Sequence, residues 1–489
     1  MKIKEFYDLY YPNKVILYNH VINKVTDYSK EVSNNDIFIC IKGYTVDGHD
    51  YIDEAVSRGA KTIIIEEDYL YFNENVNVIR SKNPLKDYNR LILMKYQEIH
   101  EKRPKFIGVT GTNGKTTITT ILYEYLKTLK LDILLVGTNG IKKYYGLKEE
   151  HIKSQNTTPR LNEIYTILSN VPLSFDYVIM EVSSQGIIEG RTMGIDFDVV
   201  VVNSLSSEHL DYHHTLNEYR DSKAFLVSSI SQNKDSVLIL NDNLTDFHFF
   251  NNLNINKTLF YGTRSNNDVF YFLKDYSISK TKFCLVINKI PYYLETNLIA
   301  DYNIENISAV SSILLSLNLD LTAFFEFIKE IPPIDGRLNI IKHKNRYFII
   351  DFGHNSEAVY RTLSFFNMIK ENNLITVIGC GGNRDKEKRP IMGNLACLYS
   401  DFVVFTEDNS RDENVNDIIN DMIKEVDKEN YEIITDRKEA IKLAYQKSTE
   451  NDFILILGKG NEKYLLKNNQ VISYSDEDYV KSLLNKLYD

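Results

Sequence analysis

The sequence predicts an α/β fold built from parallel sheets and divided into three domains. Near-continuous apolar runs at 177–184 and 197–205 are typical of central strands in a parallel sheet. Further short apolar runs alternate with helical patterns between residues 347 and 460, as in an open, Rossmann-like α/β sheet. A glycine-rich turn joins an apolar strand at 106–109 to a helical pattern that continues to Tyr125. Strand, turn and helix in this order indicate a loop that binds an anion.

Breaks in these patterns set the expected domain boundaries. A small α/β domain is expected at 1–102, with strands at 36–43 and 61–67 and an amphipathic, glycine-capped helix at 51–60. The polar stretch 98–105 is expected to be a linker, because Pro104 cannot continue a helix. A Pro-Pro turn at 330–337 closes the second segment. The sequence therefore predicts a central domain at 103–332 and a C-terminal domain at 333–489.

Composition argues against several classes of protein. The chain of 489 residues is 43% hydrophobic and 25% charged, which is ordinary for a globular protein. Its formal net charge of −10 argues against nonspecific binding to nucleic acid or anionic membranes. The four cysteines form no C-x-x-C pair and are expected to be reduced core residues of a cytoplasmic protein. No apolar leader core and no run of about 18 apolar residues is present, so no signal peptide and no membrane span are expected.

The stretch GVTGTNGKTTITTIL at 108–122 carries the clearest chemistry. Gly111 and Gly114 allow the backbone to turn its N–H groups inward, and the free N–H groups of the following helix favour phosphate. Lys115 supplies a mobile positive charge, and the Thr116 hydroxyl can bind Mg²⁺. The strict G-x-x-x-x-G-K-[ST] pattern is missed because Val109 occupies its first position. A plain strand-to-helix turn is the alternative.

Two further segments place charged groups near strand ends. Glu181 ends an apolar strand, where a carboxylate suits Mg²⁺ beside a nucleotide but could equally face solvent. The segment 206–226 holds His209, Asp211, His213 and His214, followed by Lys223 on a helical pattern. These residues fit metal or phosphate contacts. The alternatives are a surface loop with satisfied histidines and a solvated helix lysine.

Nine short motifs together carry a resemblance to a known family. GTNGKTT, NTTP, EVSS, HLDYH followed by a lysine, GR, DFGHN, GCGGNRDKEKRP, EDNSR and GKGNE occur in this order. The same order is found in the Mur ligases, and the match is closest to the MurE type, the UDP-N-acetylmuramoyl-L-alanyl-D-glutamate:diamino acid ligases of peptidoglycan synthesis. The segment 26–60 also resembles the uridine-binding domain of that family. The resemblance covers nearly the whole chain.

The resemblance implies roles for individual residues. It implies that ATP is bound by Gly111, Thr112, Asn113, Gly114, Lys115, Thr116, Thr117, Asn303, Asn306, Arg337, Asp351 and His354. It implies that the UDP-muramoyl-dipeptide is bound by Ser29, Asn156, Thr157, Thr158, Ser183 and Arg191. It implies that the amino acid is bound by Arg389, Asn409, Arg411, Gly458 and Glu462. The implied metal ligands are Thr116, Glu181, His209 and Lys223, the last as a carbamate. Lys115, Glu181, His209 and Lys223 would then be the catalytic residues.

The implied reaction is an ATP-dependent amide ligation with Mg²⁺ as cofactor. Phosphoryl transfer from ATP gives an acyl phosphate, which the amine of a diamino acid attacks. Arg411 in the D-N-S-R context implies meso-diaminopimelate as the diamino acid, and a monomer is expected. The sequence departs from the family pattern at Lys30, Gln185, Glu189, Ser410 and Asn461.

Other interpretations remain open at this point. One is a paralogue that acts on another carboxylate in a specialised pathway, and another is a nucleotide-binding module without ligase activity. An oxidoreductase is prompted by GCGGN at 379–383, which lacks the G-x-G-x-x-G spacing. Folylpolyglutamate synthetases share the central architecture but lack the apparent uridine-binding domain and the NTTP motif.

Overall fold

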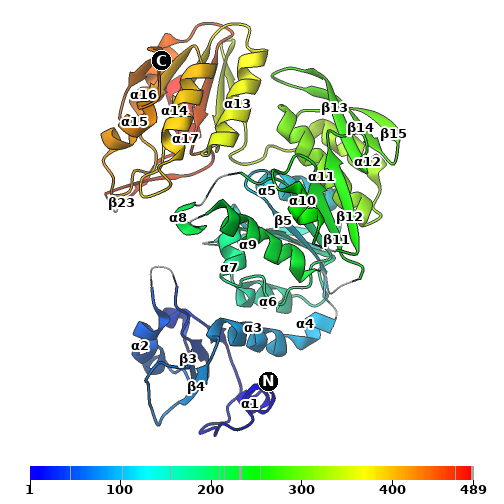
Figure 1. Ribbon diagram of the computed structural model, residues 1–489, viewed down its shortest axis with the longest axis vertical. Coiled ribbons are helices and arrows are strands. Elements are labelled where there is room, and N and C mark those ends of the chain that lie inside the picture. The colour runs from blue at the N-terminus through cyan, green and yellow to red at the C-terminus, as the bar shows by residue number, and fades with distance from the viewer. Residues whose placement is uncertain are drawn as a thin grey trace. The chain divides into compact units, whose positions relative to one another are not determined.

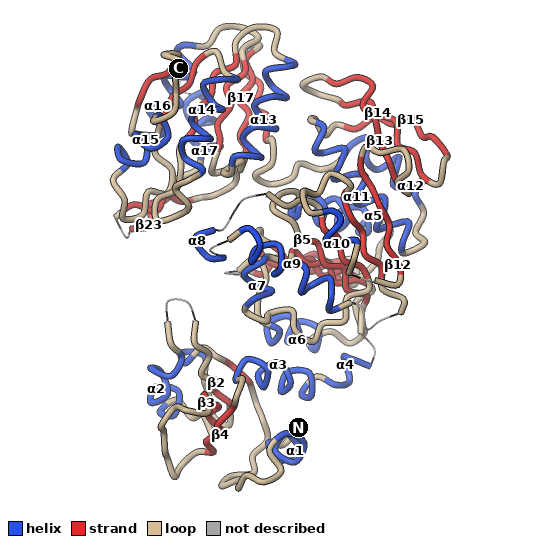
Figure 2. The backbone as a smooth tube through the Cα atoms, in the orientation of Figure 1, coloured by secondary structure: helices blue, strands red, loops and turns tan. Residues whose placement is uncertain are grey.

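The computed structural model describes residues 1–43, 46–101, 103–154, 156–206, 208, 210–213, 215–230, 234–253, 255–468 and 470–485. The described residues form two compact units. The first comprises Met1–Gly108, Leu129–Asp198 and Ser228–Lys234, and the second comprises Val109–Thr128, Val199–Val227 and Asp235–Asp489. The chain colours and element labels follow Figure 1, and helices and strands are distinguished in Figure 2.

The N-terminal part of the first unit is a small parallel sheet covered by helices. Its strand order is β1-β2-β3-β4, with β1 Val25–Thr26, β2 Ile37–Ile39, β3 Thr62–Glu66 and β4 Asn77–Ser81. The helical elements are α1 Ile3–Tyr10, η1 Ser29–Glu31, η2 Gly48–Tyr51, α2 Ile52–Ser57, α3 Pro84–Lys95 and α4 Gln97–Glu101. Phe38, Ile63 and Ile65 alternate with residues of the opposite face and pack with Ile52 and Ala55 of α2 into one core. This packing buries the apolar face of the predicted amphipathic helix.

The expected elements of this region are present with shifted bounds. The helix expected at 51–60 begins as the 3₁₀ turn η2, continues as α2 and is followed by Gly59 at φ +107°. The linker expected at 98–105 is wrong in part, because 97–101 form α4 and Lys105 already begins β5. Polar residues in a short helix on the surface resemble a linker in sequence, since neither buries a continuous apolar stripe.

The largest sheet has the strand order β15-β14-β13-β12-β11-β10-β5-β9-β6-β7-β8. Its strands are β5 Lys105–Thr110, β6 Ile133–Gly137, β7 Gly140–Tyr145, β8 Lys148–Ile152, β9 Tyr177–Glu181, β10 Val199–Val202, β11 Val237–Asn241, β12 Lys257–Gly262, β13 Val269–Tyr276, β14 Thr281–Ile287 and β15 Ile290–Thr296. The pairs β6–β9, β10–β11, β11–β12 and β12–β13 are parallel. The hairpins β6–β7–β8 and β13–β14–β15 are antiparallel. The apolar runs predicted as parallel strands are therefore β9 and β10.

Helices connect these strands. They are α5 Lys115–Thr128, α6 Leu161–Ser169, α7 Ser184–Ile188, α8 Leu210–His213, α9 Leu216–Ser229, α10 Phe247–Asn251, α11 Asp301–Ser316, α12 Leu321–Phe327 and η3 Ile328–Glu330. Helix α11 is buried almost all round, with Ile304, Ile307 and Val310 inaccessible to solvent. Its Asn306 side chain lies against Gly114 of the glycine-rich turn.

The C-terminal part is a doubly wound sheet of order β16-β17-β21-β18-β19-β20. Its strands are β16 Asn339–His343, β17 Arg346–Asp351, β18 Leu374–Ile378, β19 Phe402–Phe405, β20 Tyr431–Ile433 and β21 Phe453–Leu457, and only β16 pairs in the antiparallel sense. One face packs on α13 Ser356–Ile369, α14 Lys388–Tyr399 and α15 Val415–Ile423. The other packs on α16 Arg437–Lys447 and α17 Asp476–Asn485. The small hairpin is β22 Tyr464–Lys467 and β23 Gln470–Ser473.

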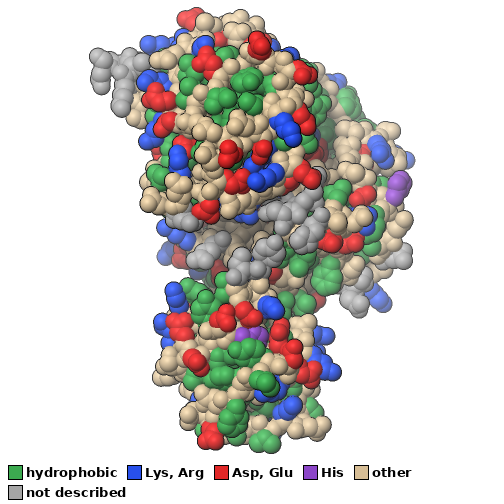
Figure 3. All heavy atoms as spheres, turned by 60° about the vertical axis from the view of Figure 1, so that its left-hand side comes forward, with side chains coloured by type: hydrophobic (Ala, Val, Ile, Leu, Met, Phe, Trp, Pro, Cys, Tyr) green, Lys and Arg blue, Asp and Glu red, His purple; other side chains and the backbone are tan. Residues whose placement is uncertain are grey.

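This architecture confirms the predicted α/β class. The four cysteines are buried and free, as expected for core residues. On the face drawn in Figure 3, Lys and Arg side chains are interspersed with Asp and Glu, in keeping with the modest net charge. Within the described part of the chain, no helix has the length and apolar character needed to cross a membrane.

Candidate active site

The glycine-rich turn has the geometry predicted for a phosphate loop. Strand β5 ends at Thr110, the turn follows, and α5 begins at Lys115. Gly111 and Gly114 have φ values of +151° and +85°. A Cβ atom at Gly114 would lie 2.2 Å from Asn203 Nδ2, so this position requires glycine for both its backbone conformation and its close packing. The N-terminus of α5 is thereby directed at the concave side of the turn.

Three side chains of the turn are held by polar contacts. Lys115 folds back over it and donates to the carbonyl oxygens of Gly111 and Thr112 at 2.6 and 2.9 Å. Thr112 Oγ1 accepts from the backbone N–H of Ser206 at 2.9 Å. The hydroxyl of Thr116, which is buried like Thr117, accepts from Arg337 Nη2 at 3.3 Å. Lys115, Thr116 and Arg337, expected together at the ATP, are thus neighbours.

Helix α11 forms a wall of the turn. Asn306 Oδ1 lies 2.6 Å from the Cβ position of Gly114, and its Nδ2 donates to Asn303 Oδ1 at 3.3 Å. Asn303 in turn donates to the carbonyl oxygen of Ile299 at 2.7 Å. Both asparagines are buried. The spacing of three residues on one helix places the two amides side by side, and Asn306 is the one that reaches the turn.

The end of the DFGHN motif and the start of α13 contribute two residues, Asn355 and Glu357, to which the sequence assigned no role. Asn355 caps α13 by accepting from Ala358 N–H at 2.9 Å, and it also donates to Asn113 Oδ1 at 3.0 Å. Asn113 donates to Glu357 Oε2 at 3.0 Å. An N-cap signal could have located Asn355 in the sequence, but its link to Asn113 spans 242 positions and has no local signature.

Asp351 and His354 lie in the same segment. Asp351 accepts from the N–H groups of Leu338 and Gly353 at 3.0 and 2.8 Å, so it fixes the turn after β17. His354 Nε2 pairs with the buried Glu208 at 3.0 Å. Glu208 was not predicted as a site residue, although it precedes His209. His209 and His214 lie outside the described residues, and Asp211 is described only in its backbone.

Lys223 is the most unusual charged residue of this region. It lies on α9 with 1% of its surface exposed, and its Nζ sits 4.3 Å from the centre of the Tyr219 ring. Burial and the nearby Lys115 lower the pKa of Lys223 well below its usual value, while Glu208 opposes that change. A lowered pKa makes an amine lose its proton more readily and so favours reaction as a nucleophile, and this environment fits the carbamate that the family resemblance implies.

The residues near the turn also fit a magnesium ion. Among the described residues, no three His, Cys, Asp or Glu side chains gather as a metal-binding group. Mg²⁺ keeps several water ligands and binds through few protein groups together with substrate phosphates. The buried Thr116 hydroxyl at the first turn of α5 is a donor of this kind.

A second set of predicted residues lies in the first unit around the end of β9. The Glu181 carboxylate, 2% exposed, accepts from Thr138 N–H at 3.1 Å and Thr138 Oγ1 at 3.0 Å. Thr157 lies 3.2 Å from the same Thr138 hydroxyl. Thr158 donates to the carbonyl oxygen of Glu181 at 2.9 Å and accepts from Ser183 N–H at 3.0 Å. The structure therefore brings the NTTP and EVSS segments together.

Arg191 extends this set, and its charge is already paired. It donates to the carbonyl oxygen of Thr158 at 2.8 Å and to Glu189 Oε2 at 2.9 Å. Gln185 donates to the other carboxylate oxygen of Glu189 at 2.9 Å. Two of the departures from the family pattern, Gln185 and Glu189, are thus bonded to each other, and Glu189 is also bonded to the predicted substrate arginine.

Two predicted residues of the first unit lie outside this cluster of contacts. Asn156 is exposed and its backbone N–H donates to Ser154 Oγ at 3.4 Å. Ser29 is buried at the start of η1 and donates to Glu54 Oε2 at 2.6 Å.

The C-terminal sheet gathers most of the residues predicted for the amino acid. Asn409 donates to Glu462 Oε2 at 2.8 Å, and the buried Lys459 donates to the same oxygen at 2.7 Å. Gly458 has φ +111°, and a Cβ there would lie 2.6 Å from Asp408 Oδ2. These residues follow β19 and β21, at the carboxyl ends where an open α/β sheet places its ligands.

Arg411 is held beside this group in a constrained conformation. Its φ is +52°, and its Nη1 donates to the carbonyl oxygens of Gly382 and Asn409 at 2.7 and 3.2 Å. Burial and the neighbouring Arg384 lower the pKa of Arg411. Two guanidinium groups close together favour an anion between or beside them.

Arg389 is placed differently from the expectation. Its guanidinium is inaccessible to solvent and donates to both oxygens of Glu413, at 2.9 and 3.0 Å, and to Asp421 at 2.9 Å. Such a guanidinium anchors α14, so assigning it to the amino acid is a poor fit to this structure. Arg384, in the same GCGGNRDKEKRP motif, lies next to Gly381 together with Arg411. Sequence spacing alone does not distinguish the two arginines of one motif.

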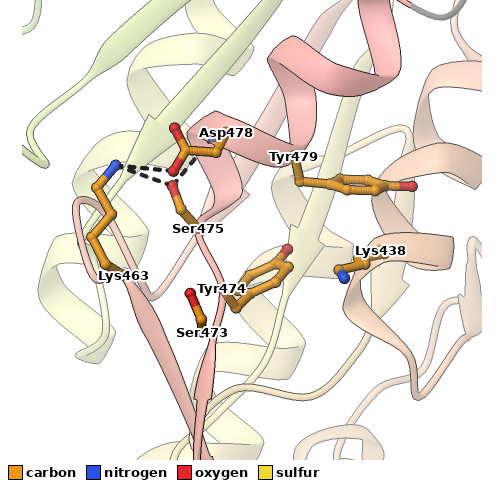
Figure 4. Close-up of a pocket in the computed structure, with 7 residues that line it drawn as sticks. All are labelled: Lys438, Lys463, Ser473, Tyr474, Ser475, Asp478 and Tyr479. Atoms are coloured by element: carbon orange, nitrogen blue, oxygen red, sulfur yellow. Dashed lines mark hydrogen bonds and ion pairs between the residues drawn. The ribbon is translucent and has the colours of Figure 1, made fainter.

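A cavity elsewhere in the C-terminal part contains none of the predicted residues. It is lined by Lys438, Lys463, Ser473, Tyr474, Ser475, Asp478 and Tyr479. Figure 4 shows Lys463 directed at Ser475 and Asp478, with distances of 3.3 and 3.4 Å, and Lys438 on the opposite side of Tyr474.

The fold and the turn define a P-loop α/β protein with the architecture of a nucleotide-dependent ligase. Three family models match in succession: "Mur ligase family, catalytic domain" at 21–105, "Mur ligase middle domain" at 109–314 and "Mur ligase, glutamate ligase domain" at 336–460. The chain belongs to the Mur ligase family, as the motifs predicted.

Individual relatives agree with this assignment. The chain is 32% identical to UDP-N-acetylmuramyl-tripeptide synthetase 2 of Oceanobacillus iheyensis over 96% of this chain and 95% of the relative. It is also 32% identical to the UDP-N-acetylmuramoyl-L-alanyl-D-glutamate--2,6-diaminopimelate ligase of Geobacillus kaustophilus over 94% of each chain. A solved structure of a ligase with that second name has a TM-score of 0.68 at 26% identity, covering 99% of both chains. MurF of Thermotoga maritima, solved with ADP, shares the fold at 18% identity, with a TM-score of 0.63 over 95% of this chain and 97% of that chain.

Proposed function

We propose that this chain is an ATP-dependent ligase of peptidoglycan synthesis. It would join a diamino acid, with meso-diaminopimelate preferred, to UDP-N-acetylmuramoyl-L-alanyl-D-glutamate. The observation that carries the proposal is the buried Lys223, whose pKa is lowered by burial and by Lys115 of the phosphate loop. A nucleotide-binding module has no need to bury a second lysine near its phosphate-binding lysine, since that costs free energy without improving nucleotide affinity. The names of the relatives supply the substrate class.

The reaction needs an activated carboxylate. The acceptor carboxylate attacks the γ-phosphorus of ATP, which gives an acyl phosphate and ADP. The amine of the diamino acid then attacks the acyl carbon, and the tetrahedral intermediate releases phosphate as the amide forms. Lys115 and the N–H groups of the turn stabilise negative charge on the transferring phosphoryl group. Mg²⁺, when bound, would neutralise further phosphate charge, with Thr116 as one of its ligands.

The remaining predicted residues bind and orient the substrates. Asn303, Asn306 and Arg337 would hold the nucleotide against the turn. Thr157, Thr158, Ser183 and Arg191 would hold the muramoyl dipeptide, with Ser29 at the uridine and Glu181 and His209 at the metal ions. Asn409 would bind the backbone end of the free amino acid and Glu462 its distal amine. Arg411 with Arg384 would bind its distal carboxylate. Holding three reactants in register is itself a large part of catalysis.

A second candidate is a paralogue that acts on another carboxylate. It is favoured by one observation, the pairing of Arg191 with Glu189. An acceptor carboxylate would compete with Glu189 for this guanidinium, which weakens binding of a doubly charged D-glutamyl group.

We further propose domain boundaries at 1–102, 103–332 and 333–489, a monomeric state and a cytoplasmic location. The decisive experiment is phosphate release by the purified protein with UDP-muramoyl-dipeptide, ATP and a panel of amino acids, with products identified by mass. The ligase releases phosphate only when both co-substrates are present and forms the matching tripeptide. Phosphate release at the same rate without UDP-muramoyl-dipeptide and amino acid would contradict the proposed function. Turnover only with another carboxylate substrate would favour the paralogue.

A further inference from the structure

An ionic cluster around a buried glutamate joins α11 to α13. Arg361 of α13 donates to Glu305 Oε2 at 2.8 Å and to Asp301 Oδ2 at 3.1 Å, both on α11. The Glu305 side chain is 5% exposed and that of Arg361 is 24% exposed. The other Glu305 oxygen accepts from Asn241 Nδ2 at 2.5 Å. Both carboxylate oxygens of this buried glutamate are therefore occupied.

The charges of this cluster depend on one another. Burial raises the pKa of Glu305, and Arg361 acts against that rise. Burial opposes the charge of Arg361, while Glu305 and Asp301 keep its pKa above the usual value. Burying the Glu305 carboxylate without the Arg361 guanidinium beside it would cost free energy of desolvation. The pair therefore favours the one arrangement of α11 and α13 in which the two groups meet.

Both helices contact the phosphate loop. Helix α11 brings Asn306 to within 2.6 Å of the Cβ position of Gly114. The start of α13 brings Asn355 and Glu357 to hydrogen-bonding distance of the Asn113 side chain, each at 3.0 Å. The loop is thus contacted from two sides by the elements that the ionic cluster joins.

We propose that Arg361 and Glu305 form a positioning clamp for the nucleotide. By fixing α13 against α11, the clamp holds Asn306 and Asn355 at the separation that the phosphate loop requires. Arg361 touches no substrate and acts through these residues. This inference rests on the proposed nucleotide-dependent function. It predicts that the clamp changes the affinity for the nucleotide and leaves the affinities for the other two substrates unchanged.

The test uses Mg·ADP binding by calorimetry together with steady-state kinetics on the full-length chain. Arg361→Met is expected to weaken Mg·ADP binding about tenfold, which is the effect of misplacing about one hydrogen bond. The KM for ATP should rise with it, while the KM for the amino acid stays within about twofold. Arg361→Lys, which keeps the charge, should recover most of the affinity. Glu305→Gln keeps the side-chain shape and the hydrogen bond from Asn241, and it should weaken Mg·ADP binding about threefold. This variant tests the clamp if Arg361→Met does not fold.

Leu363→Ala is the matched control. Leu363 lies on the same helix in the core and does not belong to the clamp. It is expected to lower the melting temperature while Mg·ADP affinity stays unchanged. Folded Arg361→Met or Glu305→Gln protein with wild-type Mg·ADP affinity would overturn the clamp, as would an equal loss in Leu363→Ala. Absence of Mg·ADP binding by the wild-type chain would instead reject the nucleotide-dependent function itself.

Discussion

Replacement of Arg389 by methionine separates a structural arginine from a substrate-binding one. Arg389 donates to both oxygens of Glu413. These bonds are the largest cause that lowers the pKa of Glu413 to about 2 from a usual 4.5; burial acts against them, and a bond from the Asn383 backbone adds to them. At 1.36 kcal/mol per pKa unit this difference corresponds to about 3 kcal/mol of stability. Glu413 is 19% exposed, so the interaction is only partly screened by solvent, whereas Asp421 is 44% exposed and adds little.

The pH dependence of this loss has a definite sign. The pKa of Glu413 is depressed in the folded state, so the stabilisation is fully present above about pH 4.5 and disappears as the pH falls toward 2. Arg389→Met is therefore expected to lower the free energy of unfolding by at most about 3 kcal/mol at pH 7, because Asn383 and Lys386 also lower the pKa of Glu413 and remain in the variant. That is roughly 6–12 °C in Tm for a domain of about 150 residues. The difference from the wild type should shrink to about half near pH 3.

Urea unfolding at pH 7, 4.5 and 3, followed by tyrosine fluorescence and circular dichroism, measures this difference. The kinetic control is the KM for the diamino acid, which should be unchanged in Arg389→Met and raised about tenfold or more in Arg384→Met. Unchanged stability of Arg389→Met combined with a raised KM for the amino acid would refute the reasoning. Arg389 would then belong to the substrate site.

Three further predictions concern the reaction. Lys115→Ala should remove ATP-dependent ligation while the circular dichroism spectrum and Tm stay close to the wild type, and near wild-type turnover would reject the phosphate-loop assignment. Lys223→Ala should lose at least two orders of magnitude in kcat, and Lys223→Arg should be no better because arginine cannot form a carbamate. A short carboxylic acid added to Lys223→Ala should restore part of the rate. Full activity of Lys223→Arg would exclude the carbamate. The wild type should use meso-diaminopimelate at least about tenfold better than L-lysine in kcat/KM, and Arg411→Ala should remove most of that preference, since one desolvated, charged hydrogen bond contributes roughly 1.5–3 kcal/mol. Equal kcat/KM values for the two amino acids in the wild type would contradict the role of Arg411.

The sequence predicted those parts of the site that depend on short-range pattern. Gly111 and Gly114 were recognisable because only glycine tolerates the positive φ and close packing of the turn. Asn303 and Asn306 were recognisable only from the resemblance to the Mur ligases, and the structure adds that their spacing of three residues on α11 brings their side chains into contact. The hairpins β6–β7–β8 and β13–β14–β15 were not predicted, because an edge strand with mixed polar residues gives a weak periodic signal.

By itself, the sequence determined the α/β class, the central strands β5, β9 and β10, the glycine-rich turn between β5 and α5, and the family. These follow from local hydrophobic periodicity, from backbone conformations that few residues tolerate, and from ordered motifs. Only the tertiary structure decided which charges meet: Arg389 with Glu413, His354 with Glu208, and Arg361 with Glu305. The physical reason is that an ion pair depends on where the folded backbone brings two side chains. A charged residue has the same local sequence signature whether its partner is a substrate, a buried carboxylate or water.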